Sequence, residues 1–162
     1  MPYVSLYEHL PMLAMNETRT ISVLTDSNSL PRGDYMLVEM YCDEPDCDCR
    51  RVIFTVKPSF SKQPVAVIAY GWEDRDFYAR WYHHDKDGSK GVTYNDLSKT
   101  DKSDIDEIKG PCLNSFSQQS KYASEILSLV TEKILTDEMY VERLKRHYMV
   151  FKRKVRRIKK RR

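Results

Sequence analysis

Runs of apolar and β-branched residues mark four strands in the first half of the chain. Each run is rich in Val, Ile, Tyr or Thr, and clusters of Ser, Asn, Pro, Gly or Asp separate the runs. The four runs are Thr18 to Leu24, Asp34 to Tyr41, Val52 to Lys57 and Val65 to Tyr70. Because the breaks are short enough for hairpins, the pattern predicts a four-stranded antiparallel meander. Residues 1–16 have weak periodicity and predict an irregular or short helical entry.

Helical periodicity follows the strands. Residues 73–82 place three aromatic side chains on one face, which predicts a short aromatic helix against the sheet. Residues 83–110 are mostly polar and predict a long loop. Residues 117–135 carry one apolar stripe, which predicts a second helix that packs on the sheet.

The last segment predicts one long helix over residues 137–160. Its first turn is acidic and its far end is basic, as the helix dipole favours. Apolar residues at steps of three and four form one seam, namely Val141, Leu144, Tyr148, Phe151, Val155 and Ile158. A helix of this length is about 36 Å long, so we expect its end to project from a small domain.

These elements predict a single α+β domain over residues 1–151, with residues 152–162 as a basic extension of the last helix. A chain of 162 residues with 41% hydrophobic residues fits one domain with a sizeable core. Low glycine and proline contents exclude collagen-like and generally disordered chains. There is neither an apolar run that could span a membrane nor the pattern of a secretory signal, so we expect a cytoplasmic protein.

The net charge of +3 hides a strong asymmetry along the chain. Twelve of the 27 Lys and Arg residues lie between Arg143 and Arg162, where there is no acidic residue. The remaining residues carry 15 basic and 24 acidic side chains. An acidic body with a basic end favours docking on phosphate backbones, acidic proteins or anionic lipid.

The basic end predicts a nucleic-acid-binding helix. It has no aromatic side chain for base stacking, so we expect salt-sensitive, sequence-independent contacts with RNA, DNA or a ribonucleoprotein. The candidate contact residues are Lys152, Arg153, Lys154, Arg156, Arg157, Lys159, Lys160, Arg161 and Arg162. The alternatives are a solvated end without function, a membrane-surface helix, and a structural protein that forms homodimers through the apolar seam.

The four cysteines carry the clearest candidate chemistry. Cys42, Cys47 and Cys49 fall between two predicted strands, at a hairpin tip. Cys112 lies just before the helix predicted from Ser117, where backbone N–H groups favour a thiolate. If this helix start reaches the hairpin tip, four thiolates could enclose a structural zinc ion. The alternatives are four unconnected reduced cysteines and a redox-active pair of Cys47 and Cys49.

A second metal candidate is the polar segment from Asp85 to Asp96, which resembles an EF-hand calcium loop. Its oxygen ligands alternate, but Lys90 stands where glycine normally allows a left-handed turn, so we expect no calcium. Signatures of nucleotide binding, acyl transfer and zinc proteases are absent. We therefore expect a binding protein, with a thiol- or zinc-dependent enzyme that uses Cys42, Cys47 and Cys49 as the alternative class.

Four segments together resemble one group of proteins. They are residues 42–52, 70–81, 109–122 and 140–148. The chain is similar over most of residues 18–152 to an uncharacterised family of bacterial cytosolic proteins, some of which end in a SEC-C type zinc motif. The resemblance implies no activity, and this chain ends in its basic run where those members carry the zinc motif.

Overall fold

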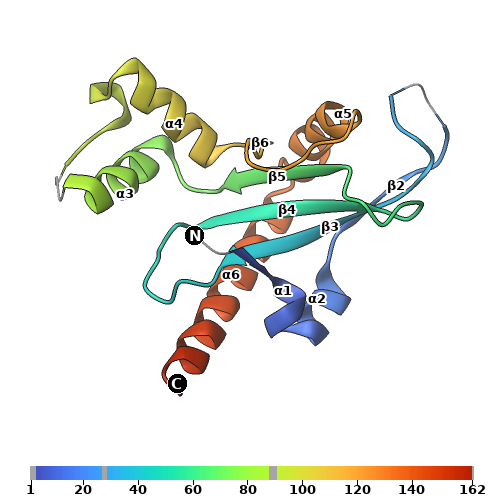
Figure 1. The fold of residues 1–162 in the computed structure, drawn as a ribbon, viewed down its shortest axis with the longest axis horizontal. Helices are drawn as coiled ribbons and strands as arrows, with labels where there is room; N and C mark the ends of the chain where they lie inside the picture. The colour runs from blue at the N-terminus through green and yellow to red at the C-terminus, as the bar shows by residue number, and fades with distance from the viewer. Residues whose placement is uncertain (1–2, 27–28, 88–90, 162) are drawn as a thin grey trace.

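The structure is a computed structural model that describes residues 3–26, 29–87 and 91–161, apart from the side chains of residues 84–87. Within these residues, six antiparallel strands form one sheet with helices packed around it (Figure 1). The strands are β1 (Tyr3–Ser5), β2 (Thr20–Val23), β3 (Gly33–Cys42), β4 (Arg51–Pro58), β5 (Ala66–Gly71) and β6 (Cys112–Leu113). The helices are α1 (Leu6–His9), α2 (Pro11–Glu17), α3 (Arg75–Asp87), α4 (Lys99–Lys109), α5 (Ala123–Leu129) and α6 (Glu138–Lys159), with a 3-10 turn at Tyr94–Asp96 and a π-helical segment at Val130–Ile134.

The α+β class and the predicted meander are confirmed. Strands β2, β3, β4 and β5 are consecutive antiparallel neighbours, and α1 and α2 are the short helices expected near the start. Two further strands were not predicted. Strand β1 pairs with the end of β3, where Tyr3 faces Cys42, and β6 pairs with β5. Strands of two or three residues are too short for an alternating pattern to reveal them.

The two faces of the sheet have different neighbours. Leu37, Phe54 and Ile68 share one face and are fully buried in a core that includes side chains of α1, α2, α5 and α6. Met40 and Ile53 lie on the other face, which borders a cavity beside α4. The core therefore lies between one face of the sheet and four of the helices.

Helix α6 is both a core element and the projecting basic element. Asp137 caps its start, because the carboxylate accepts hydrogen bonds from the backbone N–H groups of Met139 and Tyr140. The predicted apolar seam lies mostly on the buried side of α6, and Leu144 and Phe151 are among its buried residues. This seam packs inside the domain, and the end of α6 extends beyond the sheet (Figure 1).

The prediction of a long loop over residues 83–110 is wrong. Helix α3 continues to Asp87, and α4 occupies much of the rest. The apolar pattern missed α4 because this helix buries only one of its side chains, Ile105. The sequence does carry signals for both ends of α4. Ser98 caps its start by accepting a hydrogen bond from the first turn, and Gly110, with φ of +63°, ends the helix.

The second predicted helix starts at Ala123 rather than at Ser117. The segment before Ala123 lies along the edge of β5 instead. The Gln119 side chain accepts a hydrogen bond from the Val67 N–H at 2.9 Å and donates to the Val67 carbonyl at 3.0 Å. Ser120 adds a further hydrogen bond at this edge. These edge contacts outweigh the helical tendency of the segment.

A buried histidine joins three elements of the fold. His147 of α6 places Nδ1 2.7 Å from Glu39 of β3 and Nε2 2.9 Å from Glu17 of α2. The Tyr41 hydroxyl donates to the same Glu39 oxygen at 2.8 Å, and Arg146 pairs with Glu17. Burial alone would lower the pKa of His147, but the hydrogen bonds and charges of the two carboxylates outweigh it and raise this pKa.

We expect His147→Ala to lower the free energy of unfolding by about 3 to 5 kcal/mol near neutral pH, because the variant would remove one partner of a buried pair and leave the buried Glu39 side chain without its histidine. In the wild type, the stabilisation from the imidazolium is complete below its ordinary pKa of 6.5 and is lost as the pH rises through the raised pKa of the folded state. Denaturant unfolding across this pH range measures both effects. An unchanged free energy and pH dependence in His147→Ala would contradict this role.

Candidate metal centre

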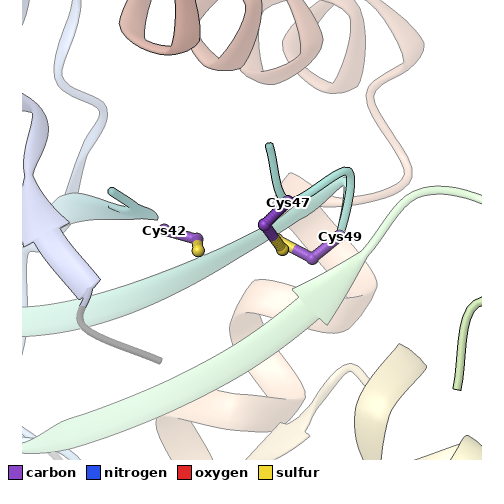
Figure 2. A group of neighbouring side chains, drawn as sticks. All are labelled: Cys42, Cys47 and Cys49. Atoms are coloured by element: carbon purple, nitrogen blue, oxygen red, sulfur yellow. The ribbon is translucent and has the colours of Figure 1, made fainter. Parts of the chain in front are cut away.

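Three cysteines meet where β3 ends (Figure 2). Cys42 is the last residue of β3, and Cys47 and Cys49 lie on the connection to β4. Their Sγ atoms all lie within 4.8 Å of one another. Cys42 and Cys49 are buried, Cys47 is half-buried, and none of them forms a disulfide. This group, the cysteine cluster, could hold a metal ion.

The three thiols of the cysteine cluster shift one another's pKa. Hydrogen bonds from the thiols of Cys47 and Cys49 lower the pKa of Cys42, and the Lys152 ammonium lowers it further. The contact with Cys42 raises the pKa of Cys47 and of Cys49, because a second thiolate would lie against the first. A bound cation would remove this penalty, so metal binding would release protons from the cluster.

Lys152 of α6 holds the beginning of the cysteine loop, residues 43–50. Only 3% of its surface is exposed. Its Nζ donates to the carbonyl oxygen of Cys42 at 3.4 Å and to that of Glu44. The charge pattern of the sequence assigned this lysine to the nucleic-acid surface, whereas the structure places it inside. Its methylene stem lies in the domain and its ammonium group satisfies two backbone acceptors.

Two more α6 side chains continue this contact along the loop. The Tyr148 hydroxyl donates to the Cys47 carbonyl at 3.4 Å. Arg156 Nε donates to the Pro45 carbonyl at 3.0 Å. Because Tyr148, Lys152 and Arg156 follow at intervals of four residues, they lie along one face of the helix. The loop that carries the thiols is therefore attached to α6 at three places.

Arg50 ends the cysteine loop in a left-handed backbone conformation. Its φ is +46°, which costs a residue with a Cβ about 1–2 kcal/mol. Its N–H donates to the Tyr148 hydroxyl at 3.4 Å, and its carbonyl accepts from the Tyr78 hydroxyl at 2.8 Å. Its guanidinium pairs with Asp48 at 2.9 Å and with Glu73 at 3.1 Å. These contacts fix the backbone directly after the third cysteine.

Cys112, the predicted fourth ligand, lies outside the cysteine cluster. It begins β6 and pairs with Ala69 of β5. Its Sγ donates to the Glu107 carbonyl oxygen at 3.3 Å, and burial raises its pKa. The prediction placed Cys112 beside a helix start at Ser117, and in the structure that helix starts later. The described residues thus bring together three of the four predicted thiols.

Two neighbours of the cluster were not predicted. The hydroxyl of Tyr3 in β1 contacts the thiol of Cys49, a pairing that follows from the unpredicted first strand. Asp43 directly follows Cys42, and its Oδ1 is buried without a hydrogen-bond partner among the described residues. Its place next to Cys42 is evident from the sequence, but the burial of its oxygen is not. Its buried oxygen is an acceptor that a proton or a cation would satisfy.

The predicted basic surface divides into an internal and an exposed part. Lys152 is internal, and Arg156 is bound to the cysteine loop. Arg156 is itself exposed; the other exposed cations of this surface, the basic tip, are Arg153, Lys154, Arg157, Lys159, Lys160 and Arg161. None of these six forms an ion pair with a carboxylate in the described part of the chain. Arg162, also predicted as a contact, lies outside the described residues.

The calcium-loop candidate falls largely outside the described side chains. Asp85 and Asp87 belong to the last turns of α3, and only their backbone is described. The carboxylate of Asp96, at the far end of the candidate loop, accepts a hydrogen bond from Thr93 Oγ1 at 2.6 Å.

Comparison with known protein families, curated proteins and solved structures gives no match. The resemblance to the bacterial family therefore stays a prediction. Within the described residues, no helix combines the length and the apolar character needed to cross a membrane.

We expect the wild-type protein to contain about one metal ion per chain and Cys47→Ser to lose it, because the variant removes one of three ligands. Cys112→Ser is the matched control and should keep the wild-type content, since its sulfur lies outside the cysteine cluster. Elemental analysis of proteins purified without chelator measures both. Equal metal loss in the two variants would contradict the three-cysteine site.

Proposed function

We propose that this protein is a zinc-stabilised, non-enzymatic binding module that docks on nucleic acid or a ribonucleoprotein through the basic tip of α6. The observation that carries the proposal is the arrangement of cations on this helix. Lys152 and Arg156 bind the cysteine loop, while the six cations of the basic tip remain exposed and without acidic partners in the described structure.

The donor set of the cysteine cluster supports zinc as the metal. Thiolates are soft ligands that favour zinc over magnesium or calcium. Zn–S bonds of about 2.3 Å in a tetrahedron correspond to sulfur separations of about 3.8 Å. The three sulfur atoms already lie within 4.8 Å of one another, so a small contraction of the loop would suffice. A fourth ligand would come from water or from a side chain outside the cluster.

The basic tip has the chemistry of a phosphate-binding surface. Its six cations lie within nine consecutive residues at the end of α6, where the helix dipole also favours positive charge. Lys and Arg side chains in such a cluster displace counterions from a nucleic-acid backbone and give binding that weakens steeply with salt. The tip lacks aromatic side chains, so we infer binding without base readout.

The cysteine loop would help to fix the position of the basic tip, because it contacts the same helix. Arg156 and Lys152 lie within the same turns of α6 as the first cations of the basic tip. A zinc ion that cross-links the loop would reduce its motion and so stabilise its hydrogen bonds with Lys152 and Arg156. These hydrogen bonds would in turn fix the direction of the helix end. Zinc in this proposal acts on structure and does not touch the nucleic acid.

A thiol- or zinc-dependent enzyme is the second candidate. It is favoured by the observation that three cysteines gather where four were predicted, because catalytic zinc sites keep one position open for water. The burial of Cys42 and Cys49 and the absence of a histidine from the group support the structural role more strongly. Self-association through the apolar seam receives less support, because most of the seam is buried inside the domain.

We expect the wild-type protein to bind labelled double-stranded DNA or RNA, and replacement of Arg157, Lys159, Lys160 and Arg161 by Gln to weaken this binding strongly. On DNA, the slope of log affinity against log salt should become shallower by about 0.9 for each phosphate that the variant no longer neutralises. Fluorescence anisotropy over a salt series measures both quantities.

The matched control replaces four exposed lysines of the body by Gln, namely Lys57, Lys62, Lys99 and Lys133. This variant has the same formal charge as the tip variant and should keep nearly wild-type affinity. Equal weakening in both variants, or wild-type binding that persists at about 0.5 M salt, would contradict a phosphate-binding tip.

A further inference from the structure

A cavity of about 690 Å³ lies on the sheet face that is turned away from the core. Its floor is apolar and consists mainly of Met40, Ile53, Val67 and Ala69 from three adjacent strands. Side chains of α4 and of the segment after β6 form its walls. Small-molecule sites are typically concave, mostly apolar and of this size, with a few polar groups that fix orientation.

Among the described residues, Arg51, the first residue of β4, is the cation that lines this cavity. It forms no ion pair with any carboxylate among the described residues. One of its terminal nitrogens donates to the Tyr3 hydroxyl at 3.4 Å. Its Nε is buried and has no hydrogen-bond partner in the described structure. A buried donor without an acceptor is unfavourable, and the planar guanidinium fits a carboxylate with two parallel hydrogen bonds.

The acidic side chains of the cavity limit the charge of a ligand. Asp104 and Glu107 of α4 both line it. Asp104 accepts a hydrogen bond from the Tyr82 hydroxyl at 3.2 Å, and Glu107 accepts one from the Ser115 hydroxyl. Both hydroxyls are neutral donors, so these hydrogen bonds bring no counter-charge to the acidic wall. A ligand with one anionic group would pair with Arg51, whereas a second anionic group would face like charge.

The rim of the cavity offers additional apolar surface. Phe116 is 97% exposed and is one of the lining residues. An aromatic side chain this exposed gains no burial within the chain itself, and an apolar ligand in the cavity would cover part of it. The cavity therefore combines an aliphatic floor, an aromatic rim and one cation, Arg51, that forms no ion pair with a described carboxylate.

We propose that this cavity binds a small apolar monocarboxylate, with its carboxylate on Arg51 and its hydrocarbon body on the floor formed by Met40, Ile53, Val67 and Ala69. The proposal is independent of the nucleic-acid role of α6. The other use of Arg51 would be as a counter-charge for the nearby cysteine cluster, which Arg51 reaches through Tyr3. In that case the cavity would bind no carboxylate.

Isothermal titration with decanoate, decanamide and decanedioate tests the proposal on the full-length protein. We expect decanoate to bind, and decanamide to bind about tenfold or more weakly because it lacks the charge that pairs with Arg51. Decanedioate should also bind more weakly, because its second carboxylate would meet the apolar floor or the acidic wall. No binding of decanoate, or equal binding of decanoate and decanamide, would overturn the proposal.

Two variants locate the site. Arg51→Met should weaken decanoate binding about tenfold or more, and Lys57→Met, which removes an exposed charge from the same strand outside the cavity, should leave it unchanged. Val67→Trp keeps Arg51 and fills the floor, so it should also abolish binding, and it decides the question if Arg51→Met does not fold. Wild-type affinity in a folded Arg51→Met or Val67→Trp protein would place decanoate elsewhere and overturn the proposal.

Discussion

The cysteine loop has no helix or strand of its own, so its carbonyl groups need hydrogen-bond donors from another part of the chain. Helix α6 supplies them through Tyr148, Lys152 and Arg156, one on each successive turn. These contacts fix the backbone from which Cys47 and Cys49 project. They also fix the rotation of α6, and with it the direction of the basic tip. The geometry of both candidate sites therefore depends on this one set of hydrogen bonds.

Helix α6 can serve both sites because its buried face is not purely apolar. Leu144 and Phe151 fill the core, while His147 and Lys152 are buried polar side chains with hydrogen-bond partners. His147 binds the Glu39 side chain of the sheet, and Lys152 binds carbonyl groups of the cysteine loop. The helix thus joins the sheet by apolar packing and by polar contacts of defined geometry, which favour one orientation over others.

The sequence predicts the elements that have strong periodicity and misses those that depend on long-range contacts. The four central strands and α6 follow from their apolar patterns. Helix α4 buries too little to show such a pattern, and its caps at Ser98 and Gly110 were the usable signal. The three clustered cysteines could be predicted because a hairpin brings them together locally. The position of Cys112 depends on its pairing with Ala69 at the edge of β5, which no local pattern reveals. Likewise, counting charges cannot separate the buried Lys152 from its exposed neighbours.

The attachment of the cysteine loop to α6 is tested most directly by the metal affinity of Lys152→Met, compared with that of Lys154→Met. Both variants remove one lysine charge from α6, but only Lys152 donates to the loop carbonyls. Residues that orient metal ligands typically change metal affinity by about 10- to 100-fold when replaced. Competition titration with a chromophoric zinc chelator should show such a loss for Lys152→Met and wild-type affinity for Lys154→Met. Equal affinities in the two variants would contradict the account.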